Sequence, residues 1–168
     1  VVSFGNAIGG DIVGSTASVN TTTLSSSGNA VVGSYTQTAA ALNGADAGNY
    51  SLTPYTTPAA NYTVGQLALT GAITADNKVY DGTTAATIAS RSLAGVVGAD
   101  DVNYAGGTAS FADRNVGTGK AVTASGLALA GADAGNYTVN STATTAADIT
   151  ARPITVTAAT NTQVYDGT

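Results

Sequence analysis

Carboxylates are the main side chains in this sequence that could do chemistry, because the chain has no His, Cys, Met or Trp and all 10 of its acidic residues are Asp. Without His or Cys there is no Ser-His-Asp triad, Cys-His dyad, zinc or iron–sulfur site, or disulfide. Asp100 and Asp101 form the one adjacent acidic pair. A glycosidase needs two carboxyls that flank one bond, whereas neighbours on a strand point to opposite faces. We therefore interpret the pair as part of a solvated turn that could weakly hold a cation. We predict that the protein is not an enzyme.

A nine-residue segment ending in Asp-Ala-Gly-Asn-Tyr occurs twice, at 42–50 and 129–137. Its informative residues are Asp46, Gly48 and Tyr50 in the first copy and Asp133, Gly135 and Tyr137 in the second. In immunoglobulin-like sandwiches an Asp-x-Gly-x-Tyr turn enters one strand and its Tyr forms the tyrosine corner. We predict turns in which each Asp accepts backbone N–H bonds and each Gly has a positive φ, followed by a buried Tyr. A calcium or glycan site at Asp133 and Asn136 is the functional alternative.

A second motif, Val-Tyr-Asp-Gly-Thr, occurs at 79–83 and again at 164–168. Its members are Tyr80, Asp81 and Gly82 in the first copy and Tyr165, Asp166 and Gly167 in the second. The pattern favours a packed tyrosine followed by an Asp-Gly hairpin turn. A ligand loop, with an aromatic platform beside a carboxylate, is the alternative.

The two motifs recur at separations of 87 and 85 residues, which indicates an internal repeat of about 85 residues. A weaker match aligns the sequence of Ser3–Ile12 with that of Leu93–Val102. We predict a first β-repeat at 1–65 that lacks its N-terminal Tyr-Asp-Gly segment, a complete repeat at 66–152, and the opening strands of a third at 153–168.

The fold class follows from composition and alternation. Ala, Thr, Gly and Ser supply 33, 28, 21 and 13 of the 168 residues, and Leu, Glu, Lys, Gln and Arg, which fill ordinary amphipathic helices, are scarce. Short segments of alternating apolar and polar residues between glycines are typical of strands, and a change of phase at Ser125-Gly126 predicts a β-bulge. We predict an all-β chain of tandem immunoglobulin-like β-sandwich modules in an elongated array.

Four segments together resemble a known family: Val79–Thr84, Ala105–Lys120, Gly131–Val139 and Ala147–Val156. They look like the YDG repeat, which stands in tandem, often beside MBG-type repeats, in large secreted bacterial surface proteins of the filamentous-haemagglutinin-like adhesin class. The resemblance implies an extracellular, non-catalytic, β-rich repeat. It supplies no catalytic or ligand-binding residue.

The resulting expectation is a structural stalk or filament segment of a secreted or cell-surface adhesin or extracellular fibre, with roles in cell adhesion and biofilm. A glycan- or receptor-binding module is the alternative. The expected partners are neighbouring repeats or copies of the chain itself, head to tail, with host or matrix glycans under the alternative. The net charge of −5 disfavours nucleic acid, and no apolar window is long enough to span a membrane. No cofactor is expected beyond weak Ca²⁺ binding.

Overall fold

The protein is mostly β in the computed structural model, which describes residues 4–21 and 23–167. Strands make up 47% of it. The helical segments in the described residues are two single 3-10 turns, η1 (Ala47–Asn49) and η2 (Ala134–Asn136). The prediction of an all-β chain is confirmed. Its physical basis is a chain rich in Thr, Val and Gly and poor in the straight side chains that favour helices.

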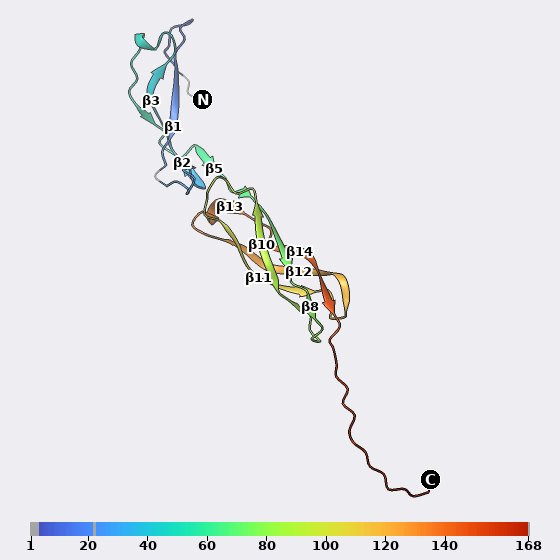
Figure 1. Cartoon of the computed structure of the whole chain (residues 1–168). Coiled ribbons are helices and arrows are strands. Elements are labelled where there is room, and N and C mark those ends of the chain that lie inside the picture. Colours follow the sequence, from blue (N-terminus) through green and yellow to red (C-terminus); the bar gives the residue numbers. More distant parts are fainter. Residues whose placement is uncertain (1–3, 22, 168) are drawn as a thin grey trace.

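The N-terminal sheet region, residues 4–64, occupies one end of an elongated molecule (Figure 1). It has a three-stranded antiparallel sheet in the order β1-β3-β4 and a separate two-stranded antiparallel pair of β2 with β5. The bounds are β1 (Gly14–Val19), β2 (Gly33–Tyr35), β3 (Gln37–Asn43), β4 (Tyr55–Thr56) and β5 (Tyr62–Val64).

The C-terminal sheet region, residues 65–150, has a five-stranded sheet in the order β8-β14-β12-β11-β9. The antiparallel pair of β7 and β10 contacts β14 and β11 of this sheet, and β6 pairs in parallel with β13. The bounds are β6 (Leu67–Ala68), β7 (Thr70–Ala75), β8 (Lys78–Val79), β9 (Ala85–Ala86), β10 (Ile88–Ala94), β11 (Asn103–Phe111), β12 (Gly117–Ala130), β13 (Tyr137–Thr138) and β14 (Thr142–Thr150).

The apolar core lies in the C-terminal sheet region. One buried cluster joins Ile73 of β7 to side chains of β11 and β12, and a second lies along β11, β12 and β14, where Val122 and Ile149 are fully buried. In the described part of the N-terminal sheet region, by contrast, Ala39 is the one buried apolar residue. Both regions are built mainly of antiparallel strands, but the C-terminal sheet region has far more buried apolar side chains.

The structure has no β-bulge at Gly126, contrary to the prediction. The pairing of β11 with β12 continues without a register shift from Asn103↔Ala130 to Phe111↔Val122. Gly126 has a φ of +74°, and Gly106 and Gly107 on the partner strand also have positive φ. Both strands thus change face at the same point, which alters the phase of burial while the register is kept from Gly106↔Leu127 to Thr108↔Ser125.

Residues 151–167 follow β14 as an extended segment that leaves the far end of the molecule without joining a sheet (Figure 1). No helix among the described residues is both long and apolar enough to cross a membrane.

Candidate functional site at the junction of the two sheet regions

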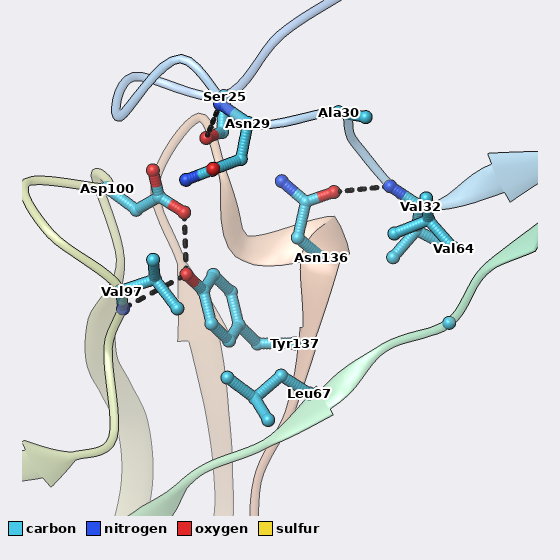
Figure 2. A pocket seen from close by; sticks show the side chains of 11 residues that line it. Ser25, Asn29, Ala30, Val32, Val64, Leu67, Val97, Asp100, Asn136 and Tyr137 are labelled. Atoms are coloured by element: carbon cyan, nitrogen blue, oxygen red, sulfur yellow. Dashed lines mark hydrogen bonds between the residues drawn. The ribbon is translucent and has the colours of Figure 1, made fainter. Parts of the chain in front are cut away.

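A hollow of about 280 Å³ lies where the two sheet regions meet, and both contribute to its lining (Figure 2). The loop between β1 and β2 and the end of β5 line one side, and the loop before β11 and the η2 turn line the other. The residues are Ser25, Asn29, Ala30, Val32, Val64, Gly65, Leu67, Val97, Asp100, Asn136 and Tyr137. Two of the sequence-predicted positions, Asp133 and Tyr137, lie at or beside this junction.

The loop from the N-terminal side is a tight turn. Ser25 accepts a hydrogen bond from Gly28 N at 2.8 Å, and Gly28 has a φ of +79° that favours glycine. The turn presents the backbone N–H groups of Ser26 and Ser27 to the C-terminal sheet region. Unpaired backbone donors of this kind need acceptors when they are covered by protein.

Two carboxylates of the C-terminal sheet region supply those acceptors. Ser26 N lies 3.2 Å from Asp133 Oδ2, and Ser27 N donates to Asp100 Oδ1 at 2.9 Å. The Ser27 hydroxyl donates to the carbonyl of Val97 at 3.0 Å and accepts from Ala99 N at 2.8 Å. The serine turn is therefore held by charge-assisted hydrogen bonds, which are stronger than neutral ones.

Asp133 accepts backbone N–H bonds, as predicted, but from distant segments and not within its own turn, where its side chain forms no cap. Its Oδ2 accepts from Asp101 N at 2.9 Å, while its own N–H donates to the carbonyl of Asp101 at 3.1 Å. The residue is buried, and its pKa lies below the ordinary value because hydrogen bonds from Ser26 and from Asp101 N favour the charged form.

Tyr137 is buried with 5% of its surface exposed, which confirms the prediction for this residue. Its hydroxyl donates to Asp100 Oδ2 at 2.6 Å and accepts from Val97 N at 3.2 Å (Figure 2). The bond with Tyr137 is the main cause that lowers the pKa of Asp100 to about 2, and the same bond raises the pKa of the tyrosine. These partners lie 37 and 40 residues upstream, so the bond is a long-range contact and not the local tyrosine corner of immunoglobulin domains.

Two amide side chains complete the junction. Asn136 accepts from Val32 N at 2.9 Å across the junction (Figure 2). Gln66 Nε2 donates to the carbonyl of Gly135 at 3.0 Å, which ties the linking segment to the η2 turn. With these bonds the described residues up to 150 form one domain and not two loosely tethered ones.

The same arrangement recurs at the free end of the N-terminal sheet region. Tyr50 donates to Asp11 Oδ2 at 2.6 Å and accepts from Ile8 N at 3.0 Å, and Asp46 Oδ2 accepts from Ile12 N at 2.8 Å. The bond to Asp11 is the main cause that raises the pKa of Tyr50. No serine turn covers this corner in the described residues, so Tyr50 is half-buried, and the prediction that it is buried was wrong in degree.

These contacts correct two details of the sequence reasoning. Asp11 accepts from Tyr50 as Asp100 accepts from Tyr137, and the two aspartates lie 89 residues apart. Ile12 therefore matches Asp101, and the predicted alignment of Ser3–Ile12 is off by one residue. Ser3 itself lies outside the described residues. The positive φ belongs to Gly44 and Gly131, at +111° and +115°, and not to the predicted Gly48 and Gly135, which belong to the 3-10 turns.

The Tyr80-Asp81-Gly82 motif forms a turn, but not a hairpin. It joins β8 and β9, which lie at opposite edges of the five-stranded sheet, so the chain crosses the end of the sheet here. Asp81 accepts from Thr83 N at 2.9 Å and from Lys78 Nζ at 2.9 Å, and these bonds lower its pKa to about 2. Tyr80 packs against the second core cluster, as predicted.

The second copy of this motif has a different environment. Tyr165, Asp166 and Gly167 lie in the extended C-terminal segment, where Tyr165 is 92% exposed. Thr168, the last residue of the motif, lies outside the described residues. One sequence motif therefore occurs in two states, packed at 79–83 and exposed at 164–167.

The sequence reasoning missed Asp100 and the serine turn as parts of the site. The sequence predicts Asp100 in a solvated turn, whereas in the structure it bonds Ser27 N and Tyr137, and no sequence feature distinguishes Ser25–Ser27. The signal for Asp100 was its spacing: Asp11 precedes Asp46 by 35 residues and Asp100 precedes Asp133 by 33. Among the described residues there is no group of three or more His, Cys, Asp or Glu that could hold a metal ion. The acidic groups of the junction accept hydrogen bonds from backbone N–H groups and from Tyr137.

Comparison with known families gives one match. Residues 64–146 match the YDG domain. This part of the chain contains a YDG domain. It runs from the end of β5 to the middle of β14 and so includes the junction residues Asp100, Asp133 and Tyr137. No curated protein and no solved structure matches the chain.

Proposed function

We propose that the chain is a non-catalytic structural segment, a stalk or filament piece, of a secreted or cell-surface bacterial adhesin or extracellular fibre. Under this proposal its two sheet regions are successive immunoglobulin-like β-sandwich repeats of about 85 residues in an elongated array. The two regions have matching corners, Asp11-Asp46-Tyr50 and Asp100-Asp133-Tyr137, which supports a repeat built on one plan.

One observation carries the proposal: the polar groups at the junction are used to join the two regions. Asp100 and Asp133 accept hydrogen bonds from the serine turn, Asn136 accepts from Val32, and Tyr137 fixes Asp100. A binding site needs polar groups that face a ligand. A spacer needs them to hold adjacent parts at a fixed angle, which is the use they have here.

The alternative is a glycan- or receptor-binding module. It is favoured by two exposed tyrosines, Tyr55 at 60% and Tyr62 at 42%, because aromatic side chains on a surface are common in binding faces.

Binding of the labelled chain to an array of glycans and matrix proteins tests the two proposals against each other. The spacer predicts no saturable binding. Saturable binding that is lost in Tyr55→Ala or Tyr62→Ala, and retained when the half-buried Tyr35 is changed to Phe, would support the alternative and contradict the spacer.

A further inference from the structure

The hollow at the junction is lined mainly by apolar side chains from both sheet regions. Val32 and Val64 line it on one side, and Leu67, Val97 and the ring of Tyr137 line it on the other. Leu67 and Val97 remain 46% and 40% exposed, although large aliphatic side chains are stabilised by burial. Exposed apolar side chains that gather in a hollow are typical of ligand sites.

The hollow has room for one small molecule. Its volume of about 280 Å³ is close to the lower end of the range for ligand pockets, roughly 300–1,000 Å³. The lining residues lie between positions 25 and 137, so segments from the interior of the sequence form all of it. A Cβ added at Gly65, which belongs to the lining, would meet no atom within 4 Å, so the space beside this glycine is open.

Two side-chain amides in the lining are not used to join the sheet regions. Asn136 accepts from Val32 N through Oδ1, and its Nδ2 has no hydrogen-bond partner among the described residues. Asn29 donates to Ser25 Oγ through its backbone N–H, and its side-chain amide is likewise without a partner in that part of the chain. Both side chains line the hollow, above the ring of Tyr137 in the view of Figure 2. They offer N–H donors to a molecule in the hollow.

The charges around the hollow limit what it can bind. Asp100 is the one charged residue of the lining, and its carboxylate accepts from Ser27 N and from the hydroxyl of Tyr137. No Lys or Arg is among the described residues that line the hollow. An anion would therefore lie beside a carboxylate without a balancing cation, and like charges disfavour binding. A cation would meet carboxylate oxygens that already accept hydrogen bonds. The lining thus favours an uncharged ligand.

We propose that the junction hollow binds one small uncharged molecule that is mostly apolar and carries a carbonyl or a similar hydrogen-bond acceptor. Its apolar part lies against Leu67, Val97 and Tyr137, and its acceptor takes the N–H groups of Asn29 and Asn136. A ligand in this position contacts both sheet regions, so its binding stabilises the junction. This inference goes beyond the proposed spacer, because it adds a small-molecule site to the joint between the two regions.

Benzamide, benzoate and toluene test the inference because they share one ring and differ in the group attached to it. Each is added to the ¹⁵N-labelled full chain, and ¹H–¹⁵N correlation spectra are recorded by NMR. Benzamide should shift the side-chain amide signals of Asn29 and Asn136 until they saturate. Benzoate is an anion and toluene has no acceptor, so each should bind at least about tenfold more weakly than benzamide.

Two variants locate the site. Asn29→Ala removes one free amide but keeps the backbone bond to Ser25, and it should weaken benzamide binding about tenfold. Gly65→Leu places a side chain in the open space of the lining and should abolish binding. Asn49→Ala, in the η1 turn at the other end of the N-terminal sheet region, is the matched control and should bind like wild type. Unchanged backbone signals of the serine turn show that the junction is intact in each variant.

Side-chain amide signals that do not move up to the solubility limit of benzamide would overturn the inference. It would also be overturned if benzoate bound as tightly as benzamide, or if the Asn29→Ala and Gly65→Leu chains bound like wild type. None of these results alters the hydrogen bonds that hold the serine turn, so they leave the proposed spacer standing. The two failures are therefore distinguishable.

Discussion

Tyr137→Phe removes a single oxygen from the centre of the junction and leaves the ring in place. The hydroxyl donates to Asp100 at 2.6 Å and accepts from Val97 N at 3.2 Å, and the residue is 5% exposed. The change removes a hydrogen bond to the half-buried Asp100 carboxylate and one from Val97 N, and a hydrogen bond to a charged group contributes about 1.5–3 kcal/mol. Tyr137→Ala removes the ring as well and should cost about 3–5 kcal/mol, as truncations of core aromatics do.

Urea unfolding at neutral pH measures both effects as changes in the free energy of unfolding. Tyr55→Phe is the control, because Tyr55 is 60% exposed and its change should have no measurable effect. The equivalent change Tyr50→Phe should cost less than Tyr137→Phe, since Tyr50 is half-buried and holds no serine turn. If Tyr137→Phe unfolds at the wild-type urea concentration, or if Tyr50→Phe costs as much, the junction is not organised as described.

Three further predictions concern acid, glycine and the core. Hydrogen bonding lowers the pKa of Asp100 from 3.8 to about 2, so the ionised Asp100 stabilises the fold above pH 4, and this stabilisation is lost as the pH falls through 2. The free energy of unfolding should therefore fall more steeply with decreasing pH in wild type than in Asp100→Asn. Gly131→Ala should cost about 1–3 kcal/mol, because φ is +115° and a Cβ would overlap the carbonyl of Asp101, whereas Gly135→Ala, in open space, should be neutral by urea unfolding. Ile149→Ala should lower the free energy of unfolding by about 2–5 kcal/mol because this side chain is 1% exposed. Ile154→Ala, on the exposed segment, is the control, and an equal fall in melting temperature for the two variants would contradict the assigned core.

Alternation and motif spacing were enough to predict the all-β class and the packing of Tyr80 and Tyr137. Asp133 was expected to accept backbone N–H bonds within its own turn, but its donors, Asp101 N and Ser26 N, lie 32 and 107 residues away. The sequence also predicted the change of phase at Gly126. It did not predict that the partner strand changes face at the same point, at Gly106 and Gly107.

The parts that could not be predicted depend on contacts between distant segments. The serine turn at 25–28 finds its acceptors more than 70 residues away, at Asp100 and Asp133, and no property of three consecutive serines indicates this. The crossing of the Tyr80-Asp81-Gly82 turn between opposite sheet edges follows from the strand order β8-β14-β12-β11-β9, which a local Asp-Gly signal does not contain. The exposed state of Tyr165 likewise depends on what packs against it and not on its motif.

The most direct test of the spacer is the distance between the two sheet regions in solution. The chain has no cysteine, so Thr16→Cys on β1 and Thr123→Cys on β12, both exposed positions, place two spin labels at known sites. Pulsed electron paramagnetic resonance then gives the distribution of distances between them. A rigid junction predicts one narrow distribution in the wild-type background and a broader one when Asp100→Asn and Asp133→Asn weaken the hold on the serine turn. A broad distribution in the wild-type background, unchanged by those substitutions, would contradict the account.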